Sequence, residues 1–195
     1  MIDLERIIQI DKDITLAING INGEFSDAVM CFFSDKIVWI PMYAGIIALM
    51  LWKLGWKKTL VVLCGVALTV VLCDQSSNIV KHCVQRLRPV NDPSMVARGL
   101  HILERGGGYS FFSAHAANAF GIALCTIIPF CKYTGKGWSR SYTAWMLVWA
   151  TMVSISRVFV GKHFLGDVIV GAIIGTLIGL CLGTLVNLTI RRSKI

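Results

Sequence analysis

Long apolar runs separated by short polar segments dominate this 195-residue sequence. A helix needs roughly 20 mostly apolar residues to cross the hydrocarbon core of a bilayer. Runs close to that length recur along the chain, and they predict an all-α integral membrane protein with five transmembrane helices in one domain, residues 1–195. The predicted spans cover residues 37–54, 59–73 with a polar extension to 88, 113–131, 141–157 and 164–190.

The first 36 residues follow a different pattern. Over residues 1–26, apolar side chains are interspersed with acidic and basic ones, which is typical of an amphipathic helix in the plane of the membrane surface. Residues 27–36 form a short, partly apolar lead-in to the first span. We therefore predict an interfacial N-terminal segment, residues 1–36. Its apolar positions are Leu4, Ile7, Ile8, Ile14 and Ile18.

The composition agrees with a membrane location. Hydrophobic residues make up 55% of the chain, charged residues make up 15%, and the mean hydropathy is +0.68, which is too apolar for a soluble domain of this size. The net charge of +8 is better explained by basic loops beside a bilayer than by nucleic acid binding, so no nucleic acid partner is expected. The seven cysteines include no C-x-x-C pair, and we expect buried thiols instead of a disulfide or metal framework.

The charges of the short loops predict the orientation in the membrane. Nine basic and no acidic residues occupy two tight turns and the C-terminal tail, whereas residues 1–36 hold seven acidic and three basic residues. The positive-inside rule then places the chain in the cytoplasmic (inner) membrane with its C-terminus in the cytoplasm and its N-terminus outside. The nine basic residues are Lys53, Lys57, Lys58, Lys132, Lys136, Arg140, Arg191, Arg192 and Lys194.

Polar side chains gather at four span ends that this topology places on the outer side. Ionisable groups at the edge of a span are costly, and they indicate a functional site. If the second helix continues to Pro89, positions 74, 78, 81, 85 and 88 share one helical stripe. The loop 89–112 faces the same side and is predicted to be an active-site loop. The polar residues are Lys81, Arg88, Ser113, His115, Ser156, Arg157, His163 and Asp167.

The two histidines and the aspartate predict nucleophilic catalysis. His163 and Asp167 are four residues apart, so they share a face if a helix begins there. A carboxylate that accepts one imidazole N–H fixes the tautomer and leaves the other nitrogen free to attack. His115 can then act as the acid for the leaving group.

The cations predict a phosphate as the group that is attacked. Lys81, Arg88 and Arg157 repel one another in a small volume unless an anion is held between them. The start of the third span adds free backbone N–H groups and the hydroxyl of Ser113. Such a site needs no metal and no other cofactor.

Three motifs in this order resemble the signature motifs of the type-2 phosphatidic acid phosphatase superfamily. The family's middle motif usually reads Pro-Ser-Gly-His, and this chain departs from it with Phe-Ser-Ala-His. Alanine at position 114 keeps the backbone N–H group but restricts φ. The motifs are Lys81-x6-Arg88-Pro89, Phe112-Ser113-Ala114-His115, and Ser156-Arg157-x5-His163-x3-Asp167.

The resemblance implies a metal-independent phosphatase on the helical core that these enzymes share with vanadium haloperoxidases. It implies that His163 attacks phosphorus and becomes a phosphohistidine, and that Asp167 orients the imidazole. His115 would protonate the leaving group and then activate water. The implied phosphate-binding residues are Lys81, Arg88, Ser113, Ala114, Ser156 and Arg157.

The implied substrate is a lipid phosphate or diphosphate that is hydrolysed at the outer face of the membrane. Undecaprenyl diphosphate is the first choice, and lipid A phosphatase and phosphatidylglycerophosphate or phosphatidate phosphatase are the alternatives. Transfer of the phosphate to another lipid instead of water stays open. A lipid-binding or transport protein is the non-enzyme alternative, although a binder needs the cations but no nucleophile or acid. The apolar spans disfavour a soluble haloperoxidase.

Glycine recurs at every fourth position of the last span. One face of that helix is therefore nearly flat, so that a neighbouring helix can approach closely. We expect this face to pack against a helix of the same chain, with a homodimer seam as the alternative. The glycines are Gly171, Gly175, Gly179 and Gly183.

Overall fold

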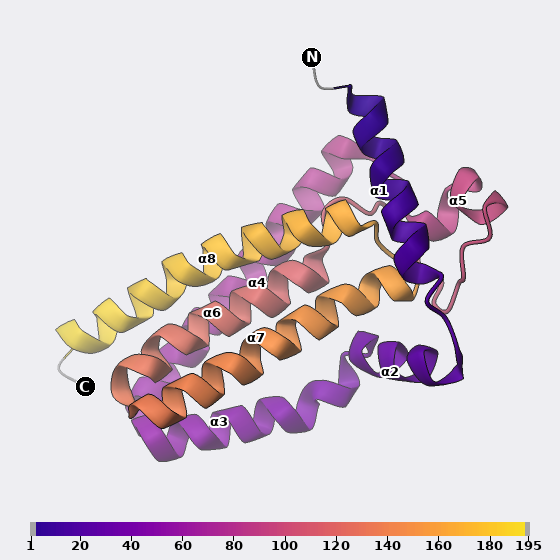
Figure 1. Ribbon diagram of the computed structural model, residues 1–195. Helices are drawn as coiled ribbons and strands as arrows, with labels where there is room; N and C mark the ends of the chain where they lie inside the picture. Colours follow the sequence, from indigo (N-terminus) through magenta and orange to yellow (C-terminus); the bar gives the residue numbers. More distant parts are fainter. Residues whose placement is uncertain (1–2, 194–195) are drawn as a thin grey trace.

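The computed structural model describes residues 3–193 and shows an all-α protein, as predicted (Figure 1). Within these residues there is no β-strand, only an isolated bridge between Leu87 and Tyr109. The bundle helices are α3 (Ile40–Leu54), α4 (Trp56–Val84), α6 (Ala114–Tyr133), α7 (Lys136–Phe159) and α8 (Leu165–Arg192). The other elements are α1 (Leu4–Asn19), α2 (Glu24–Ser34), the 3-10 turns η1 (Ile37–Trp39) and η2 (Pro89–Asn91), and α5 (Pro93–Ala97).

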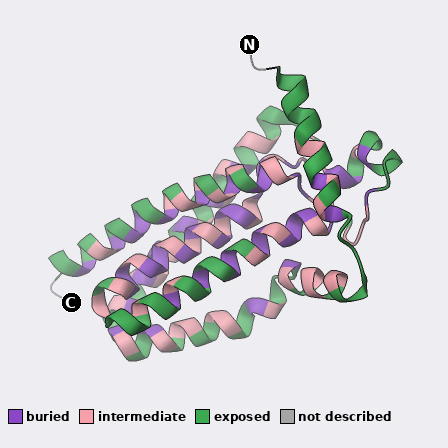
Figure 2. Ribbon diagram, viewed as in Figure 1, coloured by how far each residue is buried: buried purple, intermediate pink, exposed green. Residues whose placement is uncertain are grey.

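Helix α6 is the centre of the bundle. It packs against α4, α7 and α8, and α8 also packs against α4. Figure 2 shows buried positions along α6 and the inner faces of α7 and α8, with exposed positions on the outer faces. Many of those exposed positions are large and apolar, for example Leu68, Ile173 and Leu177. An apolar outer surface of this extent is what a bilayer covers.

Four segments are long and apolar enough to cross a membrane: residues 37–54, α4, α6 and α8. The predicted fourth span, residues 141–157, lies in the 24-residue helix α7, which runs alongside the others in the same bundle. Basic and hydroxyl side chains interrupt the apolar sequence of α7, so it does not reach the same hydropathy. The multi-pass membrane architecture is confirmed, with four strongly apolar spans instead of five.

The N-terminal segment forms two helices where one was predicted. Helix α1 ends at Asn19, and α2 occupies most of the expected lead-in. The side-chain amide of Asn19 donates to the carbonyl groups of His101 and Phe159, each at 2.8 Å, and its oxygen accepts the N–H of His101 at 2.8 Å. Because these bonds fix the end of α1 to the bundle, the chain turns there and begins a second helix.

Helix α4 ends earlier than the sequence pattern predicted. The stripe from position 74 to 88 required a continuous helix, but α4 stops at Val84. Gln85 takes a left-handed backbone conformation (φ 52°), and its N–H donates to the Lys81 carbonyl at 2.9 Å. This C-cap redirects the chain. Arg88 therefore leaves the stripe and lies in the irregular segment between α4 and η2.

The glycine face of α8 packs against α6, as expected. A Cβ on Gly175 would lie 2.1 Å from the carbonyl oxygen of Ala117, and a Cβ on Gly171 would lie 2.4 Å from that of Ser113. The other two glycines of the face, at positions 179 and 183, also meet α6 closely. Since α6 covers this face, it is not available as a homodimer seam.

Substitution of Gly175 with alanine is expected to lower the melting temperature of the detergent-purified protein. The added methyl group overpacks the α6–α8 contact, an effect that typically costs about 1–3 kcal/mol. Gly45→Ala on α3 is the matched control, because a Cβ there meets nothing within 4 Å. Equal melting temperatures for the two variants would contradict this packing.

The two ends of the bundle differ in character. The α3–α4 and α6–α7 turns lie at the same end as the last residues of α8, and that end carries the basic residues of the predicted cytoplasmic side (Figure 1). Lys194, one of those residues, lies outside the described residues. The helix ends that carry the three motifs lie at the opposite end. Which end faces the cytoplasm stays a prediction.

Candidate active site

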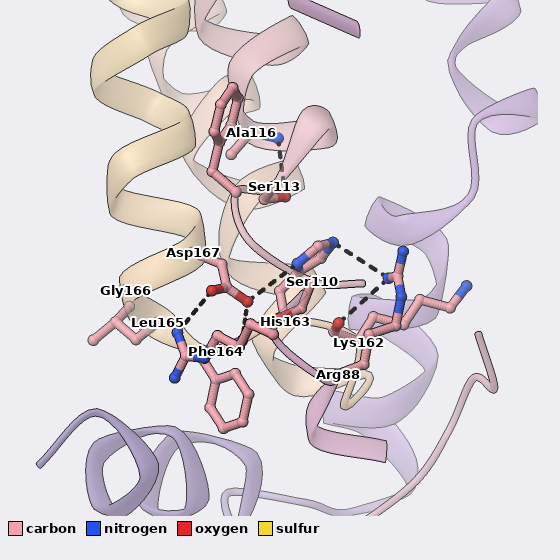
Figure 3. Close-up of polar contacts among 12 residues, drawn as sticks. Arg88, Ser110, Ser113, Ala116, Lys162, His163, Phe164, Leu165, Gly166 and Asp167 are labelled. Atoms are coloured by element: carbon pink, nitrogen blue, oxygen red, sulfur yellow. Dashed lines mark hydrogen bonds and ion pairs between the residues drawn. The ribbon is translucent and has the colours of Figure 1, made fainter. Parts of the chain in front are cut away.

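Four segments far apart in the sequence meet at one end of the bundle: the chain after α4, the start of α6, the end of α7 and the first turn of α8 (Figures 1 and 3). The Ser113 N–H donates to the Asp167 carbonyl at 3.0 Å, which joins the second motif to the third. Arg88 lies against His163, which joins the first motif to the third. The structure thus brings the three motifs together.

His163 lies between a carboxylate and a guanidinium group (Figure 3). Its Nδ1 is 3.4 Å from Oδ2 of Asp167, and its Nε2 is 3.4 Å from Nη1 of Arg88. His163 is 1% exposed and Asp167 is fully buried. With the ring proton on Nδ1 toward Asp167, Nε2 carries a lone pair that accepts from Arg88. This nitrogen is therefore directed toward the cation and away from the carboxylate.

Burial sets the protonation state of His163, which lies in the loop between α7 and α8. Loss of water around the ring lowers its pKa to about 4; the charges of Arg88 and Arg157 act in the same direction, and Asp167 opposes them. The imidazole is therefore neutral at pH 7. A neutral ring is the form that can attack phosphorus.

The pH dependence of kcat/KM is expected to reflect this lowered pKa. As the pH falls, protonation of Nε2 removes the nucleophile, so the acid limb of the profile should lie near pH 4 instead of near the ordinary histidine value. The measurement is kcat/KM across the acid range, together with an NMR titration of isotope-labelled histidines in His163-containing and His163→Ala protein. A His163 resonance that titrates at the ordinary histidine pKa would contradict the buried neutral ring.

Asp167 is held from several directions. Its Oδ2 accepts the N–H of Phe164 at 3.0 Å, and its Oδ1 accepts Nη1 of Arg86 at 2.8 Å. These bonds fix the plane of the carboxylate, with Oδ2 beside the imidazole of His163. The orientation of the carboxylate is therefore fixed by donors of the protein itself.

The start of α6 provides the second motif. Ser113 is the N-cap, and its buried Oγ accepts the N–H of Ala116 at 3.4 Å. Ala114 is the first residue of the helix and does not have a positive φ, so alanine fits where the family usually has glycine. His115 follows on the first turn, and both Ala114 and His115 line a cavity of about 290 Å³.

The three predicted cations are positioned differently. Arg88 donates through Nε to the Gly107 carbonyl at 2.9 Å. Arg157 is 3% exposed; its Nη1 donates to the carbonyl (3.1 Å) and to the hydroxyl of Ser34 at the end of α2, and its Nε has no partner among residues 3–193. Lys81 is half-buried on the last turn of α4. The Nε–H group of Arg157 thus stays available for a phosphoryl oxygen.

Ser156 does not direct its side chain toward these groups. Its hydroxyl is buried and donates to the Val153 carbonyl at 2.8 Å within α7. The predicted contact of this hydroxyl with phosphate is therefore not supported by the geometry, because its proton is already used inside the helix.

Several residues of the site were missed by the sequence analysis. Arg86, only two residues before Arg88, pairs with Asp167, and a second arginine within the first motif was the one available signal. Glu104 in the 89–112 loop pairs with Lys162, the neighbour of His163, and accepts the hydroxyl of Ser34 at 2.6 Å. The 89–112 loop is thereby bonded both to the α7–α8 loop, which carries His163, and to the end of α2.

The cysteines belong to no site. All seven are free thiols; Cys73 and Cys125 are buried, whereas Cys64 and Cys181 are exposed on the outer surface of the bundle, contrary to the expected burial. An apolar thiol on a lipid-facing helix surface is not costly. Over the part of the chain that the structure describes, no three histidine, cysteine, aspartate or glutamate side chains gather as a group that could hold a metal ion.

Comparison with known proteins agrees with this geometry. The model of the PAP2 superfamily matches residues 42–191. A lipid A 4′-phosphatase of Bacteroides thetaiotaomicron is 38% identical over 175 residues, which cover 88% of this chain and 75% of that protein. A lipid A 4′-phosphatase of Porphyromonas gingivalis is 29% identical over 178 residues, with 90% and 72% coverage.

Two crystal structures share the fold. A transmembrane PAP2-type phosphatidylglycerolphosphate phosphatase from Bacillus subtilis superposes with a TM-score of 0.74 at 22% identity, covering 94% of this chain and 88% of that one. Aquifex aeolicus LpxE superposes with a TM-score of 0.62 at 21% identity, covering 87% and 92%. At these identities the likeness concerns the fold.

Proposed function

The chain belongs to the PAP2 superfamily, and we propose that within this family of membrane phosphatases it hydrolyses the 4′-phosphate monoester of lipid A. The observation that carries the phosphatase chemistry is the buried His163–Asp167 pair with Arg88 beside the free ring nitrogen. The observation that favours this lipid is the 38% identity to a lipid A 4′-phosphatase across most of both chains.

Undecaprenyl diphosphate, the first choice from the sequence alone, is less well supported. Both curated relatives are lipid A 4′-phosphatases, and none of the proteins compared above is described as acting on undecaprenyl diphosphate. Lipid A phosphatase, one of the original alternatives, therefore becomes the main proposal. The three motifs could not distinguish these lipids, because they contact the phosphate group that all of them share.

In the first step, Nε2 of His163 bonds to phosphorus while the P–O bond to the lipid alcohol breaks. Asp167 holds the Nδ1 proton and stabilises the charge that develops on the ring. His115 donates its proton to the leaving oxygen. Arg88 and Arg157 stabilise the charge on the phosphoryl oxygens in the transition state.

In the second step, water resolves the phosphohistidine. His115, now neutral, takes a proton from a water molecule whose oxygen attacks phosphorus. The P–N bond to His163 breaks, and inorganic phosphate is released. The backbone N–H groups at the start of α6 and the charge of Lys81 stabilise the phosphate in both steps.

The cavities support a lipid as the leaving group. The cavity beside His115 includes the polar side chains of Asp74 and Asn118. A second cavity of about 180 Å³, lined mainly by apolar side chains, adjoins it and shares Tyr43 and Ile122. A cavity with several polar groups beside His115, followed by an apolar one, suits an acylated sugar, whose hydroxyl leaves beside His115 while its acyl chain extends between α3 and α4.

We further propose that the site faces the outside of the cytoplasmic membrane. This orientation is supported by the basic residues at the opposite end of the bundle. Met95 is buried in the 89–112 loop, whereas its neighbour Val96 is exposed. Val96→Cys, in a background without native cysteines, would therefore test the orientation with an impermeant thiol reagent. Labelling in intact cells is expected, and labelling only after lysis would reverse the orientation.

The substrate proposal is tested with the detergent-purified protein and excess chelator. Bisphosphorylated lipid A, undecaprenyl diphosphate and phosphatidylglycerophosphate are compared for phosphate release, and mass spectrometry locates the phosphate that lipid A loses. Selective loss of the 4′-phosphate is the expected result. Faster release from another lipid would keep the chemistry and overturn the substrate. Binding of lipid without release from any of them would favour the lipid-binding or transport alternative.

A further inference from the structure

Three polar side chains repeat at four-residue intervals on one face of α1, and all of them contact the bundle. Oδ1 of Asp11 accepts the N–H of Gly166 at 2.8 Å, and Oγ1 of Thr15 accepts the N–H of Leu165 at 3.0 Å. Asn19 makes the bonds described above. Thr15 and Asn19 are at most 1% exposed. This interfacial helix therefore docks through its polar stripe, while many of its apolar side chains stay exposed.

The polar stripe of α1 caps α8. Phe164 occupies the N-cap position of α8, but its side chain has no oxygen to accept the free N–H groups of the first turn. Asp11 and Thr15 supply these acceptors from a different helix. Asp11 also places a negative charge at the positive end of the helix dipole. The turn that carries Asp167 is therefore built jointly by α1 and α8.

Arg86 connects this cap to the catalytic pair. Its Nη2 is 2.7 Å from Oδ2 of Asp11, its Nη1 is 2.8 Å from Oδ1 of Asp167, and its guanidinium stacks 3.7 Å from the centroid of the Phe164 ring. The planar guanidinium group of arginine can bond two carboxylates in fixed directions, whereas the ammonium group of lysine has no fixed donor plane. Arg86 thus holds Oδ1 of Asp167 in place, so that the other carboxylate oxygen, Oδ2, stays directed at His163.

We propose that Arg86 and Asp11 are positioning residues of the phosphatase, which hold the Asp167 carboxylate, and through it the His163 ring, in the orientation required for attack. Helix α1 then belongs to the catalytic unit as well as to the membrane surface. The inference rests on the proposed roles of His163 and Asp167 and does not depend on the lipid. The family match begins at residue 42, so α1 lies outside the matched region.

The test compares Arg86→Lys and Asp11→Asn with Asp13→Asn. Asp13 lies on the same helix and forms an ion pair with Arg98 at 2.7 Å, but that pair is exposed and has no link to Asp167. Loss of a group that orients a metal-binding side chain typically costs about 10- to 100-fold in activity, and we take the same scale for a group that orients a catalytic carboxylate. We expect a loss of that size in kcat for Arg86→Lys and Asp11→Asn with KM nearly constant, and wild-type kinetics for Asp13→Asn.

Two further readouts separate positioning from a structural role. Arg86→Gln removes a positive charge next to Asp167, so the His163 ring, which faces Asp167 on one side and Arg88 and Arg157 on the other, is expected to protonate at higher pH. The acid limb of kcat/KM should shift upward. Thr15→Val removes one acceptor of the α8 cap but keeps the three charged groups. It is expected to lower the melting temperature without shifting the pH profile.

His163→Ala provides the reference for each outcome. If it is inactive and Arg86→Lys and Asp11→Asn behave like Asp13→Asn, the inference is overturned and the proposed function stands. If Thr15→Val shifts kcat and the pH profile as Arg86→Gln does, capping alone explains the effect and the inference is also overturned. If His163→Ala keeps full activity, the proposed function itself has failed.

Discussion

Replacement of His163 with alanine is expected to reduce lipid phosphate hydrolysis by a factor on the order of 10⁶, the scale seen when a nucleophile is removed from a catalytic unit that acts as a whole. Nε2 of His163 is the ring nitrogen that faces Arg88, and its lone pair is available because Nδ1 faces Asp167. Without it there is no atom to form the covalent intermediate. Phosphate binding should persist, since the cations remain.

The measurement is the rate of phosphate release by His163→Ala, together with its affinity for inorganic phosphate. His82→Ala is the matched control, because it removes another imidazole at the same end of the bundle: His82 lies on the last turn of α4, where it is exposed and packs edge-on against Tyr109. Wild-type turnover is expected for His82→Ala. Residual turnover of His163→Ala above a few per cent would mean that another group, or water directly, attacks phosphorus.

Asp167→Asn is expected to lower kcat by a factor on the order of 10⁴, as a wrong tautomer does in hydrolases with a comparable histidine–carboxylate pair. Oδ1 and Oδ2 of Asp167 both accept from donors, which are Arg86, Phe164 and His163. An asparagine keeps one oxygen and turns an NH₂ group toward a donor. Either His163 loses its partner or Arg86 is left with an uncompensated charge.

Single-turnover kinetics distinguish these effects from unfolding. The rate of the chemical step is expected to fall in Asp167→Asn while the melting temperature decreases only moderately, because Ser113 still bonds to the backbone carbonyl of residue 167. A variant with wild-type turnover would show that the carboxylate is a structural cap of α8 and takes no part in orienting the imidazole.

The sequence predicted the convergence of the motifs for a physical reason. Membrane helices alternate in direction, so the side of each polar cluster follows from the count of spans. The spacing of His163 and Asp167 predicted their pairing, but not its geometry: His163 lies just before α8, so the two residues meet across the start of the helix and do not share a helical face. The alanine at position 114 also proved compatible with the helix start. These features depend on local pattern and topology, which a single sequence carries.

Other features depended on contacts that no local pattern encodes. The end of α4 was misplaced because a single left-handed residue, Gln85, stops the helix inside a polar stripe that could have continued. Arg157 was expected to bind phosphate, but its Nη1 donates to Ser34, which is 123 residues away in sequence. The polar stripe of α1 was not recognised, because Asp11 and Thr15 find their donors in the first turn of α8, far away in sequence.

The central claim is that His163 becomes phosphorylated during turnover, and trapping of this intermediate tests it most directly. The protein is mixed with its lipid phosphate substrate, quenched rapidly in base, in which phosphohistidine survives, and analysed by peptide mass spectrometry. A phosphate on the peptide that contains His163, absent in His163→Ala, is the predicted result. Turnover at the wild-type rate with phosphate on another residue, or with none on the protein within the first turnover, would contradict the account.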